Sequence, residues 1–243
     1  MNLENFIREF GEIAKSREAG QIIEKGASPI AELSANDDFV DECLARILID
    51  DDFMSMQKES VWPNEVTVYR HPQRIFSILM YIWETGMADI VHDHNSWGIV
   101  CVARGQLEET KYRRLDDGSR PYYAELETLA SKRMNPRGIT SVLPFNEGIH
   151  EMKNVDNGPT ITFNVYGIPE KRGHILFFDP QRRSYKEAYP PRTLTKVLAA
   201  RALLTRPEKA QEVLGKASGM RHPQAVLDEV RRALSHLKST SGL

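Results

Sequence analysis

The sequence is poor in cysteine, since its 243 residues include only Cys43 and Cys101. Two cysteines provide no disulfide framework, so we expect a cytoplasmic protein in a reducing compartment. Long apolar runs are lacking too. No stretch approaches the roughly 18 apolar residues of a membrane span, and residues 1–16 mix charged with apolar residues, unlike a signal peptide. The formal net charge is only −2, which argues against nucleic acid or a membrane surface as a main partner.

Amphipathic helices are expected before the first strands. Hydrophobic residues make up 41% of the chain, enough for a sizeable core. Apolar residues at helical spacing predict helices over residues 3–16 and 37–48, and Asn36 is a suitable N-cap for the second. We expect these helices to cover one face of the sheet that follows, with Cys43 as a small core residue on the apolar stripe.

Short β-rich segments separated by turn residues occupy the chain between residues 65 and 188. Eleven strands are expected, at 65–69, 75–83, 90–93, 98–103, 107–112, 122–129, 140–143, 150–155, 160–166, 174–178 and 184–188. No long helical pattern separates them. The pattern therefore predicts a mainly β protein, an antiparallel sandwich or a jelly-roll barrel.

The pattern becomes helical again after Pro190 and Pro191, with helices expected over 193–205, 207–217 and 223–238. We accordingly divide the chain into N-terminal helices packed on the barrel (1–60), the barrel (61–190) and a C-terminal helical extension (191–243). The extension either packs on the barrel or mediates a homodimer, and the sequence does not choose between them.

The stretch from Gly86 to Gly105 carries the first chemical motif, His92-Asp93-His94. Side chains alternate along a strand, so both imidazoles should leave one face and Asp93 the other. A third imidazole, His150, lies in a later stretch with turn residues before it. Three converging neutral imidazoles can hold a divalent metal and leave positions open for substrate.

These motifs resemble a known family. Gly86, His92, His94, Gly98 and Gly105 have the spacing of the first cupin motif. The residues similar to the second motif are Pro144, Gly148, His150 and Asn154. The usual glutamate of the first motif is replaced by Gly98, as in thiol dioxygenases of the cysteine dioxygenase type, particularly bacterial ones.

The resemblance covers roughly residues 60–190 and implies a cupin double-stranded β-helix. It also implies a mononuclear Fe(II) ion and O2-dependent conversion of a small thiol to its sulfinic acid. Three neutral imidazoles leave the charge of the ion uncompensated, which favours an incoming thiolate. Residue chemistry alone also describes a catalytic zinc site, so iron comes from the resemblance.

Three polar side chains, Thr162, Asn164 and Tyr166, alternate along one expected strand and should share the face that points into the site. The family usually has Ser-His-Tyr at these positions, with the tyrosine hydroxyl donating a hydrogen bond near the iron. Tyr166 matches, Thr162 keeps the hydroxyl, and Asn164 lacks an imidazole that could titrate near neutral pH. Ordinary strand residues are the alternative for Thr162 and Asn164.

Substrates of the family usually carry a carboxylate that pairs with an arginine. Arg172, just after the Tyr166 strand, is the first candidate and Arg70 the second, with a solvated surface charge as the alternative for each. Trp97 and Met152 are candidates for the wall of the substrate pocket, or are ordinary core. Cys101 is offset from the position of the cysteine that some relatives cross-link to the tyrosine, so we expect no such bond.

These features predict an iron-dependent thiol dioxygenase acting on a small thiol, such as cysteine or 3-mercaptopropionate, and O2. Two alternatives remain at this point. One is a cupin metalloenzyme with the same three histidines and a non-thiol substrate. The other is a non-catalytic cupin that binds a small molecule and uses the helical extension for interaction.

Overall fold

The computed structural model describes residues 1–16, 18–169 and 172–240. The chain forms two compact units, which we call the barrel unit and the helical unit. The barrel unit comprises Met1–Lys58, Trp62–Glu170 and Leu176–Lys186, and the helical unit comprises Glu59–Val61, Lys171–Ile175 and Glu187–Leu243. The N-terminal helices thus belong to the same unit as the sheets, because they share a core with them.

The N-terminal helices are α1 (Leu3–Ile13), α2 (Ala19–Ser34), α3 (Asp37–Ile49) and α4 (Asp51–Ser55). Asn36 caps α3 as expected, its side chain accepting from Phe39 N. Helices α2 and α4 were not expected. Gly20, Gly26 and Pro29 lower the intrinsic helix propensity of the α2 segment, but α2 buries one face in the core and forms nonetheless.

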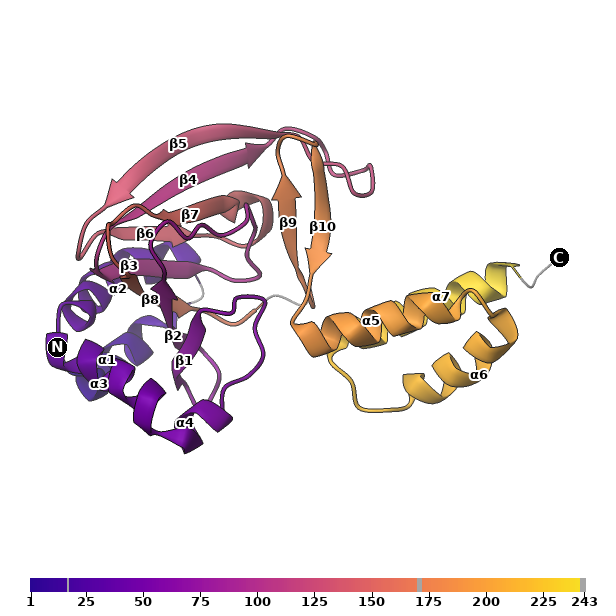
Figure 1. The fold of residues 1–243 in the computed structure, drawn as a ribbon, viewed down its shortest axis with the longest axis horizontal. Helices are drawn as coiled ribbons and strands as arrows, with labels where there is room; N and C mark the ends of the chain where they lie inside the picture. Colours follow the sequence, from indigo (N-terminus) through magenta and orange to yellow (C-terminus); the bar gives the residue numbers. More distant parts are fainter. Residues whose placement is uncertain (17, 170–171, 241–243) are drawn as a thin grey trace. The chain divides into compact units, whose positions relative to one another are not determined.

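Two sheets form the body of the barrel unit (Figure 1). The five-stranded sheet has the order β1-β2-β8-β3-β6 and the three-stranded sheet the order β5-β4-β7. A hairpin of β9 and β10 completes the ten strands. In chain order the strands are β1 (Glu65–Arg70), β2 (Ser77–Trp83), β3 (Gly98–Arg104), β4 (Leu107–Arg114), β5 (Leu126–Met134), β6 (Ile139–Val142), β7 (His150–Asn154), β8 (Thr160–Tyr166), β9 (Ile175–Asp179) and β10 (Ser184–Ala188).

The pairings within both sheets are antiparallel, and the mainly β architecture with flanking helices is confirmed. Strand β8 lies in the middle of the five-stranded sheet, between β2 and β3. Its residues alternate between two cores. Ile161, Phe163 and Val165 pack against the N-terminal helices, whereas Tyr166 packs against the cluster that both sheets share.

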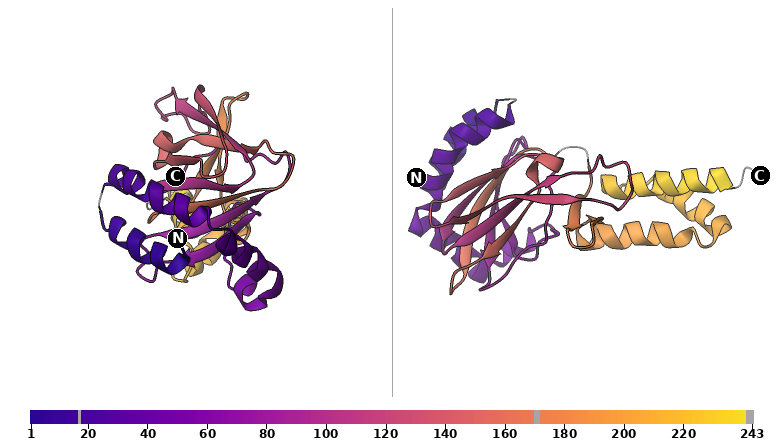
Figure 2. Two further views of the ribbon diagram at one scale, coloured as in Figure 1. Left: turned by 90° about the vertical axis from the view of Figure 1, so that its left-hand side faces the viewer. Right: turned by 90° about the horizontal axis from the view of Figure 1, so that it is seen from above.

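The N-terminal helices therefore cover the outer face of the five-stranded sheet, as expected (Figures 1 and 2). Phe6 and Phe10 of α1 and Phe39 of α3 are buried there, and the Phe39 ring lies 4.9 Å from the Phe163 ring. Cys43 and Cys101 are free and buried in the same core. Burial raises the pKa of the Cys43 thiol to about 12, so this thiol remains protonated and inert.

Two of the strand predictions were wrong. Residues 90–93 form isolated bridges to two different segments and no continuous strand. The strand expected at 122–129 begins later and is β5, Leu126–Met134. An Asp116 carboxylate oxygen accepts from Gly118 N and from the Arg114 side chain. These hydrogen bonds stabilise the loop before β5, and the first residues of the expected strand, 122–125, belong to this loop.

The helical unit contains α5 (Pro191–Leu203), α6 (Pro207–Ser218) and α7 (Gln224–Thr240), close to the expected ranges. Its own apolar core includes Val197, Leu214 and Val230. Prolines occupy the first turns of α5 and α6, where a missing amide hydrogen costs nothing. Among the described residues, none of the helices has the length and apolar character to cross a membrane.

The contact between α3 and β8 gives a prediction about stability. Phe163→Ala removes a fully buried ring and should lower the free energy of unfolding by about 3–5 kcal/mol. Leu48→Ala, at a side chain 81% exposed on α3, should change it by no more than about 0.5 kcal/mol. Urea unfolding followed by circular dichroism measures both. Equal effects of the two substitutions would contradict the assignment of this core.

Candidate metal centre

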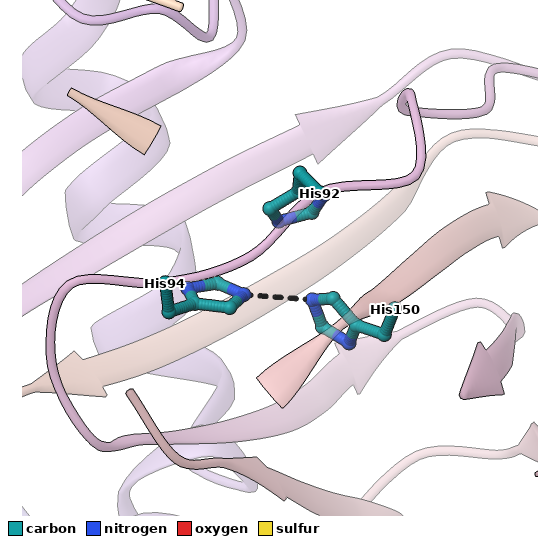
Figure 3. A group of neighbouring side chains, drawn as sticks. All are labelled: His92, His94 and His150. Carbon is teal, nitrogen blue, oxygen red and sulfur yellow. Dashed lines mark hydrogen bonds between the residues drawn. The ribbon is translucent and has the colours of Figure 1, made fainter. Parts of the chain in front are cut away.

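A reciprocal pair of backbone hydrogen bonds joins His92 to His150. His92 N donates to His150 O at 2.8 Å, and His150 N donates to His92 O at 3.0 Å. Residues directly opposite in an antiparallel pair project their side chains to the same face. The ring of His94, two residues along, turns to the same place, and the three imidazoles converge (Figure 3).

The three rings are close enough to share one ion. Their centroids lie 4.7, 4.8 and 4.9 Å apart, and one nitrogen from each ring lies within 4.8 Å of the others. His94 Nε2 and His150 Nε2 are 2.9 Å apart. Two nitrogens at adjacent corners of an octahedron, each about 2.1 Å from an ion, would be separated by roughly 3 Å. The donor set therefore fits a divalent metal ion.

The other ring nitrogens of His92 and His150 fix the orientation of these ligands. His92 Nδ1 lies 2.8 Å from the carbonyl oxygen of Ile90, and His150 Nδ1 lies 2.7 Å from Glu109 Oε1. Both contacts require Nδ1 to carry hydrogen, which leaves Nε2 as the lone-pair donor. Burial, with His150 adding to it, holds the pKa of His92 well below its usual range. A neutral imidazole is the form that binds metal.

Asp93 lies between the two ligands and faces the other way, as expected. Its side chain is fully buried and accepts from Leu176 N at 2.7 Å, while Asp93 N donates to Leu176 O at 3.2 Å. The ligand-bearing segment is therefore held by β7 through His92 and by β9 through Asp93. The segment is thus fixed on two sides without being a regular strand.

A small cavity of about 20 Å³ lies beside the histidines, with room for about one water molecule. The residues that line it are Trp62, Asn64, Tyr81, Trp83, Asp89, His92, His150, Met152, Asn164 and Tyr166. Met152 in this lining is 2% exposed. The Trp62 ring packs on the His92 ring at 4.6 Å. Aromatic side chains thus shield one side of the histidine cluster from water.

The three polar residues of β8, Thr162, Asn164 and Tyr166, differ in whether they line the cavity. Tyr166 stacks on the His94 ring at a centroid distance of 5.6 Å, and Asn164 Nδ2 donates to the Tyr166 hydroxyl at 3.1 Å. Burial raises the pKa of Tyr166 and outweighs this hydrogen bond, which lowers it. Thr162 is fully buried, and its hydroxyl accepts from Trp83 Nε1 at 3.3 Å. Thr162 therefore supports a cavity wall, while Asn164 and Tyr166 line the cavity itself.

The remaining expected residues are not among those that line this cavity. Arg70 is exposed at the end of β1 and does not line this cavity. Arg172 belongs to the helical unit, where its Nε donates to the carbonyl oxygen of His174. Trp97 is not among the cavity-lining residues either. The Trp97 ring instead packs against Phe10 of α1, in the core that the N-terminal helices share with the sheet. It also leaves no space for a side chain at Gly167.

Sequence reasoning missed three residues that contact the ligands: Trp62, Asp89 and Glu109. Asp89 Oδ1 accepts from Met152 N, and its Oδ2 lies 3.7 Å from His92 Nδ1. Glu109 had a detectable signal, since it occupies the inward position between Leu107 and Lys111 on an alternating strand. Trp62 and Asp89 lie outside regular strands, so no periodicity marked them.

Comparison with known proteins gives a family match over part of the chain. Residues 72–173, which include all three histidines and Tyr166, match the family model described as cysteine dioxygenase type I. The resemblance is confirmed over this region. The sequence outside it, including the helical unit beyond β10, is not part of the match.

Several of the solved structures that resemble part of the chain have cupin in their names. The chain covers 66% of the cupin domain of Cnp3 from Schizosaccharomyces pombe, with 47% of its own length aligned, 11% identity and a TM-score of 0.32. It covers 96% of the cupin domain of an XRE family transcriptional regulator from Enterobacter cloacae, with 44% of its own length aligned, 15% identity and a TM-score of 0.31. The chain covers 81% of a cupin 2 conserved barrel domain protein from Salinispora arenicola, with 45% of its own length aligned, 14% identity and a TM-score of 0.32.

The structure gives a reason for glycine at position 98, where the expected motif has no glutamate. A Cβ atom at Gly98 would lie 2.4 and 2.6 Å from two carbons of the Tyr166 ring. The tyrosine occupies the space that a side chain at position 98 would need. The absence of a carboxylate ligand and the presence of the tyrosine are therefore one feature of the packing.

Gly98→Ala should consequently displace the Tyr166 ring and lower stability by about 1–3 kcal/mol, the usual cost of overpacking. The change should also move the ring away from His94 in a crystal structure of the variant. Gly158→Ala is the matched control, because a Cβ there meets no atom within 4 Å. A Gly98→Ala protein with wild-type stability and an unmoved Tyr166 would show that this contact is not restrictive.

Proposed function

We propose that this protein is an Fe(II)-dependent thiol dioxygenase that converts a small carboxylate-bearing thiol to its sulfinic acid. The observation that supports it most directly is a buried set of three imidazoles with Tyr166 beside it and no carboxylate in the set. The family match supports the reaction class. Cysteine and 3-mercaptopropionate are the first substrates to consider.

The reaction balances without a further reductant. A thiolate sulfur gains both atoms of O2, losing four electrons while O2 gains four. His92, His94 and His150 would hold the iron, which supplies a Lewis acid that favours the thiolate and an electron source for O2. A histidine that binds a metal does so in its neutral form, so the three ligands themselves would add no negative charge to the ion.

Tyr166 and its neighbours would hold the substrate and keep water out. The pKa of Tyr166 is raised by burial, so its hydroxyl remains a hydrogen-bond donor throughout the neutral range. Asn164 orients this hydroxyl, and Thr162 holds Trp83 against the cavity. Trp62, Trp83 and Met152 provide an apolar wall that limits competing reactions with water.

The decisive experiment measures O2 uptake by the iron-loaded protein with cysteine, 3-mercaptopropionate and cysteamine, followed by mass spectrometry of the products. We expect thiol-dependent uptake and a product with two added oxygen atoms. His150→Ala, which removes a ligand, should abolish it. Thiol binding without uptake would favour a non-catalytic cupin, and turnover of another substrate class would favour a different cupin metalloenzyme.

The arginine that recognises the carboxylate can be identified with the same assay. Loss of a charge-assisted hydrogen bond costs about 1.5–3 kcal/mol. The position of Arg172 in the sequence, just after the Tyr166 strand, makes it the first candidate, so with 3-mercaptopropionate as the substrate Arg172→Ala should raise the Michaelis constant roughly 10- to 150-fold. Cysteamine has no carboxylate, and its Michaelis constant should stay unchanged. Arg70→Ala serves as the comparison. A large effect in Arg70→Ala with none in Arg172→Ala would reverse the assignment.

A further inference from the structure

Glu109 on β4 contacts the third histidine from behind. His150 uses its two ring nitrogens differently, because Nε2 lies 2.9 Å from His94 Nε2 while Nδ1 lies 2.7 Å from Glu109 Oε1. The side chains of His150 and Glu109 are 2% and 3% exposed. A carboxylate therefore lies one imidazole ring away from the position an ion would take.

The Glu109 carboxylate is fixed on both oxygens. Thr140 Oγ1 donates to Oε2 at 2.5 Å, while Oε1 accepts from His150. Hydrogen-bond donors thus meet both carboxylate oxygens, an arrangement that favours the ionised form of Glu109. The only nearby cation in the hydrogen-bond and ion-pair contacts of the described residues is Lys111, whose Nζ lies 4.0 Å from Oε2 and whose side chain is 40% exposed.

This arrangement changes the electrostatics of the metal centre. Three neutral imidazoles alone leave the full charge of a divalent ion uncompensated, whereas Glu109 places a negative charge against the distal nitrogen of one ligand. A carboxylate in this position makes an imidazole a better electron-pair donor and fixes its tautomer. The same negative charge opposes the binding of an anion to the ion in a low-dielectric site.

We propose that Glu109 is a positioning residue that strengthens metal binding through His150 and weakens the binding of anions at the metal centre. Thr140 holds the carboxylate in place, and Lys111 partly offsets its charge. This inference rests on the metal site of the proposed function but not on the identity of the substrate. It predicts opposite effects on two affinities, which mere damage to the site would not produce.

The test uses Glu109→Gln, which keeps the size of the side chain and an oxygen that can accept from His150 while removing the charge. Co(II) titrated into the metal-free protein should bind 10- to 100-fold more weakly than to the wild type. Azide added to the Co(II)-loaded protein, followed by visible absorption, should bind more tightly. Glu108→Gln is the matched control, since Glu108 is the neighbour on the same strand and pairs with Arg133 outside the site.

Unchanged Co(II) affinity in Glu109→Gln, or a fall in both affinities, would overturn the inference. If this variant does not fold, Lys111→Met tests the same electrostatics with the opposite sign, because Co(II) should then bind more tightly and azide more weakly. No shift in Lys111→Met would also overturn it. Wild-type protein that binds Co(II) but oxidises no thiol would refute the proposed function alone, and protein that binds no divalent metal would refute both.

Discussion

The antiparallel bridge between His92 and His150 is the interaction on which the rest of the metal centre depends. Its two backbone hydrogen bonds bring together segments that are distant in sequence and force both imidazoles to one face. Asp93 anchors the opposite edge of the same segment to Leu176. The ligands are thereby positioned by backbone pairing on two sides, a more rigid support than a surface loop would provide.

Around this bridge, close packing and hydrogen bonds both hold the ligand-bearing segments in place. His94 stacks on Tyr166, and the Tyr166 ring leaves room at position 98 only for glycine. Asn154 Nδ2 donates to the carbonyl oxygens of Trp83 and Gly158, so the second motif ends in a residue that ties the end of β7 to its neighbours. Motif residues that do not face the ion are thus explained by the packing that holds the ligands.

The electrostatic character of the centre comes from groups outside the motifs. Burial favours the neutral form of His92 and lowers the pKa of its imidazole. The Glu109 carboxylate lies on the far side of the His150 ring from the other two histidines, and Thr140 and Lys111 contact that carboxylate. A site can therefore lack acidic ligands and still be influenced by an acidic side chain, which the ligand set alone does not reveal.

The sequence by itself determined the β-rich architecture, the flanking helices and the three histidines, because alternation and helical spacing are local properties that residues express wherever they lie. It did not reveal α2, since Gly26 and Pro29 oppose a helix that only packing against Phe10 and the sheet makes favourable. Only the tertiary structure placed Glu109 behind His150 and Trp62 on His92, and put Trp97 outside the cavity. Contacts between strands depend on register and on which segments become neighbours, and no local pattern of residues encodes either.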